Sequence, residues 1–182
     1  FGLLTGYPCC TANLHQGWPK YVRTMWLRAP KGGLAVPVYG PSTVTTTAGA
    51  DDTEVTIREE TNYPFEGTVR FTVSTPAPVA FPLHLRVPGW ATSARLTVNG
   101  TAAGVPAEAG TFAVIDRTWQ DGDVVELMID LPIAVSRWHE RSVAVERGPL
   151  QVTVDEEGET RVRDRYVASA PLPGRMRRIE LE

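Results

Sequence analysis

Two adjacent cysteines, Cys9 and Cys10, are the only cysteines of the 182-residue chain. A disulfide between neighbours would close a strained small ring, outside normal disulfide geometry. The two thiols are therefore free, bound to a metal ion, or reactive. A thiolate is both a strong nucleophile and a soft zinc ligand, so this pair is the first candidate for chemistry. Spacing alone also allows a simpler interpretation, in which both are small buried side chains.

A zinc site at this pair would need further ligands. Structural zinc is usually tetrahedral, so two cysteines leave two ligands to find. His15 is the only histidine nearby in the sequence. His84 and His139 are isolated, and we expect each to lie in a strand or loop rather than at a metal ion.

The segment that follows the cysteines has the apolar period of a helix between Thr11 and Leu27. Its stripe consists of Leu14, Trp18, Tyr21, Val22, Met25 and Trp26. The positive end of such a helix would favour the thiolate form of the cysteines that precede it. Pro19 interrupts the pattern, so the helix either kinks there or begins there with Pro19 at its first position. We expect a kinked helix from about residue 12. The aromatic stripe is expected to pack against a large surface, of which the rest of the chain supplies part.

From about residue 32 onward the hydrophobic period falls to two, which is typical of strands with one buried face. About ten short strands separated by Gly, Pro and Asp turns continue to Asp155. This pattern predicts a mainly β fold, an antiparallel and jelly-roll-like β-sandwich, and argues against a parallel sheet. Asn99-Gly100 is the strongest hairpin signal, and it explains the sequon Asn99-Gly100-Thr101 better than glycosylation does.

Other side chains are weaker candidates for a site. The adjacent acids Asp51-Asp52 and Glu59-Glu60 are expected to lie on solvated faces. Trp90, Trp119 and Trp138 would suit a sugar-stacking platform, but core or interface packing is the simpler interpretation. No phosphate loop, dinucleotide fingerprint or Ser-His-Asp pattern occurs in the sequence.

Composition excludes several classes of protein. A formal net charge of −3 gives no basic footprint for nucleic acid. No run approaches the roughly 18 apolar residues of a membrane span. The chain begins Phe1-Gly2 with neither a methionine nor a basic leader, so we expect a fragment or a processed product without a signal peptide. Reduced thiols favour the cytoplasm.

Five segments, taken in order, resemble glycoside hydrolase family 127 and its relatives, the β-L-arabinofuranosidase-like enzymes. They are residues 7–20, which contain the cysteine pair, and residues 62–67, 85–90, 119–123 and 146–150. The first resembles the segment that closes the catalytic barrel of the family. The resemblance implies that residues 1–31 end an (α/α)6 barrel and contribute one leftover helix. Residues 32–155 would form the β-sandwich, and 156–182 an extension or the start of a further β segment.

The same resemblance implies roles for the cysteines. Cys9 would be the nucleophile of a retaining hydrolase, and Cys9 and Cys10 would both bind zinc. The remaining zinc ligands and the acid/base glutamate of the family lie upstream of this segment. We therefore expect the isolated chain to be inactive, with its zinc site incomplete. The whole protein would bind a carbohydrate, and the chain without its barrel would self-associate, with a homodimer as one form.

Two alternatives stay open on sequence grounds. The chain is also consistent with a non-catalytic carbohydrate-binding or structural β-sandwich in which the cysteine pair is a relic. It is also consistent with a small zinc-binding protein that dimerises through Cys9 and Cys10.

Overall fold

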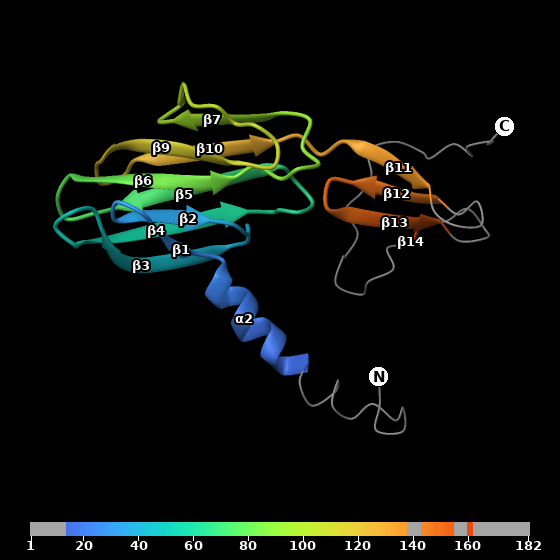
Figure 1. Ribbon diagram of the computed structural model, residues 1–182, viewed down its shortest axis with the longest axis horizontal. Coiled ribbons are helices and arrows are strands. Elements are labelled where there is room, and N and C mark those ends of the chain that lie inside the picture. Colours follow the sequence, from blue (N-terminus) through green and yellow to red (C-terminus); the bar gives the residue numbers. More distant parts are fainter. Residues whose placement is uncertain (1–13, 138–142, 155–159, 162–182) are drawn as a thin grey trace.

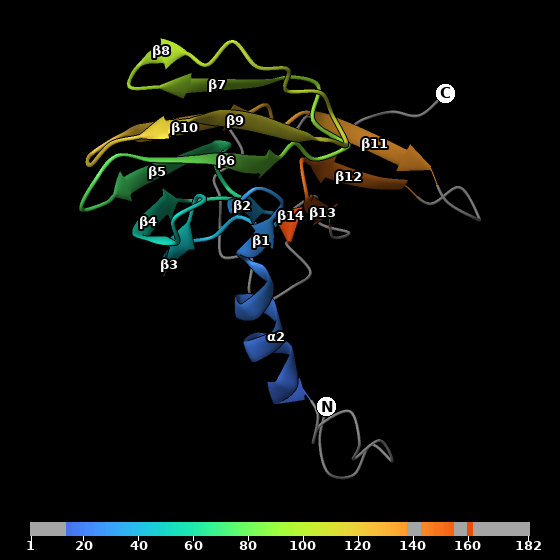
Figure 2. The ribbon, with the colours of Figure 1, turned by 60° about the vertical axis from the view of Figure 1, so that its left-hand side comes forward.

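The computed structural model describes residues 14–137, 143–154 and 160–161 (Figure 1). Two β-sheets face each other, a helix projects from one end of the pair, and a third sheet follows them in the chain (Figures 1 and 2). The mainly β, largely antiparallel sandwich expected from the sequence is confirmed. Cys9 and Cys10 lie outside the described residues.

The helix is shorter than the apolar period predicts. α2 (Gly17–Thr24) follows a single 3₁₀ turn, η1 (Leu14–Gln16). Pro19 lies in the first turn of α2, where a backbone N–H has no acceptor within the helix, so the proline fits without a lost bond. The expected continuation to Leu27 is wrong, because β1 (Leu27–Ala29) begins there and pairs with β2 (Gly33–Val36). The expected start near residue 12 lies outside the described residues.

The first sheet of the sandwich has the order β1-β2-β6-β9. Its two longer strands are β6 (Val79–Arg86) and β9 (Phe112–Trp119). The second sheet has the order β3-β4-β5-β10-β7-β8. Its strands are β3 (Ser42–Ala48), β4 (Thr53–Thr61), β5 (Thr68–Ser74), β10 (Val124–Ile129), β7 (Ala94–Val98) and β8 (Thr101–Ala102). The Asn99-Gly100 hairpin joins β7 to β8 as expected.

One strand pair departs from the antiparallel pattern. β2 and β6 run parallel, with Leu34 beside Leu83 and Val36 beside Leu85. All four of these side chains are buried. This pairing makes the first sheet mixed, while the other strand pairs described are antiparallel, so the prediction of an antiparallel rather than a parallel sheet architecture stands.

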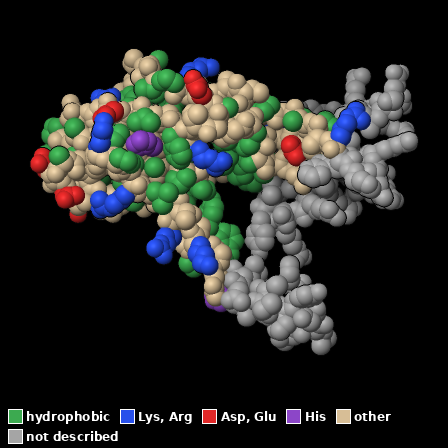
Figure 3. All heavy atoms as spheres, in the orientation of Figure 1, with side chains coloured by type: hydrophobic (Ala, Val, Ile, Leu, Met, Phe, Trp, Pro, Cys, Tyr) green, Lys and Arg blue, Asp and Glu red, His purple; other side chains and the backbone are tan. Residues whose placement is uncertain are grey.

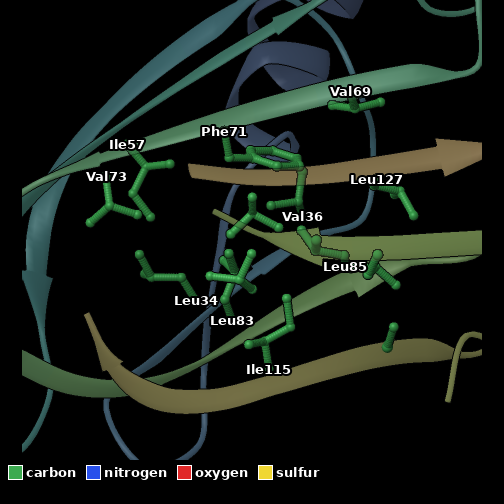
Figure 4. Packing of buried hydrophobic residues seen from close by; sticks show 14 of the residues in the cluster. Leu34, Val36, Ile57, Val69, Phe71, Val73, Leu83, Leu85, Ile115 and Leu127 are labelled. Carbon is green, nitrogen blue, oxygen red and sulfur yellow. The ribbon is translucent and has the colours of Figure 1, made fainter. Parts of the chain in front are cut away.

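The core fills the space between the first two sheets. Every second residue of β4, β5 and β10 points inward, which is how a strand with period two buries one face. Figure 4 shows these side chains meeting those of β2, β6 and β9. Fully buried members include Ile57, Val69, Phe71, Val73, Leu83, Leu85 and Leu127.

A third sheet follows the sandwich, with the order β11-β12-β13-β14. It comprises β11 (Ile133–Arg137), β12 (Val143–Arg147), β13 (Leu150–Val154) and β14 (Thr160–Arg161). Its turn residue Gly148 lies against Trp90 and Leu131, where a Cβ would come within 3.2 Å of the indole. The proposed domain boundaries at residues 31 and 155 remain predictions.

Candidate functional site

The described part of the chain contains no alternative to the cysteine pair as a metal site. Within residues 14–137, 143–154 and 160–161, no three His, Cys, Asp or Glu side chains are grouped to hold an ion. His15 is exposed beside the helix, and His84 lies half-buried in β6. His139 lies outside the described residues. The ligand set predicted at Cys9 and Cys10 is therefore neither completed nor replaced by the sandwich residues described.

The tryptophans do not form a sugar platform among the described residues. Trp119 is fully buried and its indole donates to the Phe81 carbonyl oxygen at 2.9 Å. Trp90 is half-buried against Gly148. Core and interface packing therefore accounts for both, and Trp138 lies outside the described residues.

The structure instead places an unexpected polar group in the core. Glu59 is 1% exposed and follows Val55 and Ile57 on the inward face of β4. The expectation that Glu59-Glu60 marks a solvated face is correct for Glu60, which is exposed, and wrong for Glu59. Adjacent strand residues point to opposite faces, so only one of two neighbouring acids can be solvated here.

The Glu59 carboxylate accepts two hydrogen bonds. One comes from the Gly40 backbone N–H and the other from the Ser42 hydroxyl, each at 3.0 Å. Ser42 lies directly opposite Glu59 in the β3–β4 pair. The Ser42 oxygen also accepts the indole N–H of Trp26 at 3.0 Å. A continuous chain of hydrogen bonds therefore runs from Trp26, next to helix α2, into the core.

Aromatic rings surround this carboxyl group. Phe71 is the cross-strand partner of Glu59 in β5, and the Trp26 ring meets the Phe71 ring edge-on at 6.0 Å. Tyr39 packs against Phe71 and Tyr63. Burial among these groups raises the pKa of Glu59 to about 7, and the hydrogen bonds from Gly40 and Ser42 oppose that rise only in part.

The same environment keeps the neighbouring phenol neutral. Burial raises the pKa of Tyr39 above its usual range, and the nearby Glu59 charge acts in the same direction. The Tyr39 hydroxyl donates to the carbonyl oxygen of Arg86. In the described residues, the ion pairs join Arg58 to Glu60, Arg70 to Glu126 and Arg117 to Asp123, so Glu59 is buried without a cationic partner.

Glu59 has no access to a substrate, because its carboxylate is buried and both of its oxygens are engaged by the protein. This site therefore organises structure at the junction between helix α2 and the sandwich rather than performing acid-base chemistry. A sequence signal for it did exist. Val55, Ile57 and Glu59 occupy alternate positions of β4 and therefore share its inward face. Of the two adjacent acids, this alternation identifies Glu59 as the buried one.

Comparison with known proteins decides the family. The profile of the middle domain of family 127 β-L-arabinofuranosidases matches residues 33–131. This stretch spans more than half of the chain and contains both sheets of the sandwich except β1. The chain belongs to glycoside hydrolase family 127. The family resemblance seen in the sequence motifs is thereby confirmed.

Individual relatives of the family agree in sequence and in fold. A non-reducing end β-L-arabinofuranosidase of Bifidobacterium longum subsp. longum is 29% identical over 158 residues, which cover 80% of this chain and 23% of that protein. A solved glycoside hydrolase superposes with a TM-score of 0.71 and 36% identity, covering 84% of this chain and 27% of the other. The family 127 β-L-arabinofuranosidase of Geobacillus stearothermophilus T6 gives a TM-score of 0.70 and 35% identity, covering 79% of this chain and 23% of the other.

The family 127 chain described here thus spans about a quarter of the length of these relatives. Its matched middle domain begins at Gly33, just after the strand that connects helix α2 to the sandwich. The cysteine pair precedes that helix in the sequence. No helix among the described residues is long and apolar enough to cross a membrane.

Proposed function

We propose that this chain is a portion of a retaining glycoside hydrolase that acts on β-L-arabinofuranosides or related sugars. The observation that carries the proposal is the middle-domain match over residues 33–131, with a Cys-Cys pair ahead of it. Two matched proteins bear the name β-L-arabinofuranosidase, which supports this sugar class. In the proposal, Cys9 is the nucleophile, and Cys9 and Cys10 are zinc ligands.

The chemistry parallels retaining hydrolysis by two carboxylates, with sulfur in the nucleophilic role. The Cys9 thiolate attacks the anomeric carbon, and a C–S bond forms as the bond to the leaving oxygen breaks. An acid in the rest of the protein gives its proton to that oxygen. Water then attacks the same carbon and gives one of its protons to the acid/base group, the C–S bond breaks, and the thiolate leaves.

The donor types of the cysteine pair fit zinc, since thiolates are preferred ligands of that ion. Bound zinc would keep the sulfur deprotonated at neutral pH. Two thiolates fill half of a tetrahedral site. We propose that the other ligands and the acid/base group lie in the rest of the protein, since no three metal-binding side chains are grouped among the described residues. We therefore propose that the 182-residue chain is inactive by itself and that its sandwich supports the catalytic domain.

Zinc and thiol analysis together with an activity assay tests the proposal. The isolated chain should bind no zinc, expose two reactive thiols and leave an aryl β-L-arabinofuranoside intact. The longer protein should bind zinc and release the aryl alcohol with retention, and Cys9→Ala should abolish turnover. Turnover by the isolated chain, or full activity of Cys9→Ala in the longer protein, would overturn it. One zinc per two isolated chains would indicate the dimeric zinc-binding alternative.

A further inference from the structure

Helix α2 is attached to the sandwich near its C-terminal end. It projects away from both sheets in two views (Figures 1 and 2), and none of its residues is buried. Burial begins just after the helix, where Met25 is 5% exposed and Trp26 is half-buried. Among the described residues, a small number of contacts at this end therefore set the direction of the helix.

Those contacts converge on the short segment that leads into β3. A Cβ on Gly40 would lie 3.0 Å from the Met25 methyl carbon and 3.6 Å from the Tyr21 hydroxyl, so the end of the helix packs against this glycine. The Trp26 indole is hydrogen-bonded to Ser42, two residues further on. The surface that receives the helix is thus residues 40–42.

Glu59 holds that receiving segment from the core side. One carboxylate oxygen binds the Gly40 N–H and the other binds the Ser42 hydroxyl, so a single side chain fixes both ends of the segment. A buried carboxyl without a cation costs stability, whereas Val55 and Ile57 occupy the equivalent inward positions at no such cost. The polar group therefore contributes defined geometry rather than net stability.

We propose that Glu59 is a positioning residue for the cysteine segment. It acts through Gly40 and Ser42 on Met25 and Trp26, and so sets the direction in which helix α2 leaves the sandwich. Because Cys9 and Cys10 precede this helix in the chain, the inference rests on the proposed function for its catalytic consequence. The structural part, control of the helix direction, stands independently.

Helix α2 is long enough for a small change in its direction to displace its far end by more than about 1 Å. Eight helical residues extend about 12 Å at 1.5 Å per residue, so a tilt of about 10° moves the far end of α2 by roughly 2 Å. Misplacement of reacting groups by about 1 Å is enough to cost on the order of 100-fold in rate. Loss of a hydrogen bond at Ser42 can therefore displace the N-terminal end of α2, from which the sequence continues back to the cysteines.

Hydrogen exchange in the 182-residue chain tests the structural part. In Glu59→Gln only one side-chain oxygen remains as an acceptor, so the Gly40 N–H and the Ser42 hydroxyl cannot both keep their bonds. In Ser42→Ala the Trp26 indole loses its acceptor. Both variants should speed exchange of the Trp26 indole N–H and of the α2 backbone amides, by about tenfold, and leave β5 and β10 protected. Glu60→Gln is the matched control, since Glu60 is exposed on the same strand. Wild-type exchange in α2 and at Trp26 in both test variants would overturn the proposal.

Kinetics of the longer protein test the catalytic part. Glu59→Gln and Ser42→Ala should lower kcat about tenfold with KM within twofold, since the nucleophile is displaced while sugar contacts elsewhere persist. Glu60→Gln should match the wild type. Unchanged kcat in both test variants would overturn the catalytic consequence. Activity that survives Cys9→Ala would overturn the proposed function instead, and the exchange result would still decide the role of Glu59.

Discussion

Glu59 and Ser42 face each other across the β3–β4 pair, and the serine hydroxyl donates to the buried carboxylate at 3.0 Å. The pairing ties a core position of β4 to the residue that receives the Trp26 indole. A titratable carboxyl group in this position makes the stability of the sandwich depend on pH. Its hydrogen bond to Ser42 also connects the core to Trp26, which follows helix α2.

The raised pKa of Glu59 predicts that the chain loses stability as pH rises. The folded-state pKa of about 7 exceeds the ordinary value of 4.5, so between these values the folded chain binds more protons than the unfolded chain. The stabilisation is fully present below pH 4.5 and is lost as pH rises through 7, up to about 3 kcal/mol. Urea unfolding at pH 5 and pH 8 should show this loss. In Glu59→Gln the free energy of unfolding should no longer fall between these two pH values. An equal fall in the variant and the wild type would show that Glu59 is not its source.

Asp123 predicts the opposite pH dependence in a lower range. Burial would raise the pKa of its side chain, but hydrogen bonds from Asn99 and the Gln120 N–H, together with the Arg117 charge, lower it below 3.8. Its contribution is present above pH 3.8 and is lost as pH falls through the folded value. Asp123→Asn should lower the free energy of unfolding at pH 7 by about 1–2 kcal/mol. The control is Asp116→Asn, an exposed position on β9 that should change it little.

Gly67 is required by a close backbone approach. A Cβ at this position would lie 1.8 Å from the Ile129 carbonyl oxygen, which cannot move without disturbing the bond from the Ile129 N–H to the Gly67 carbonyl. Gly67→Ala should therefore destabilise the chain by about 3 kcal/mol. Gly17→Ala is the matched control, because a Cβ at Gly17 meets nothing within 4 Å. Equal thermal unfolding midpoints for the two variants would refute this.

The sequence was sufficient for the sandwich because the signals involved are local. Alternation in Val69, Phe71 and Val73 defines the buried face of β5 without knowledge of its neighbours. The motifs identified the family because they lie in a fixed order along one chain. The Asn99-Gly100 turn likewise needs only two residues and formed the expected hairpin.

The rest depended on partners that are distant in sequence. Ser42 meets Glu59 only once β3 and β4 are in register, and Trp26 in turn is bonded to Ser42, so no local pattern predicts these hydrogen bonds. The parallel contact of β2 with β6 joins segments about fifty residues apart. The burial of Glu59 follows from its phase in β4, which overrides the usual solvent preference of an acidic side chain.

The apolar face of α2 predicts self-association of the 182-residue chain. Trp18 and Val22 are more than 60% exposed, and Figure 3 shows hydrophobic side chains along the helix where it leaves the sandwich. In the proposed whole protein this face would be covered by the catalytic domain, and in the isolated chain a second copy can cover it. Sedimentation should show a concentration-dependent increase in mass.

Val22→Lys should raise the dissociation constant of this self-association about tenfold, because burying a valine contributes about 1.5 kcal/mol or more. Val114→Lys, on the outer face of β9, should leave it unchanged, and a chain that stays monomeric at high concentration would contradict the proposed surface.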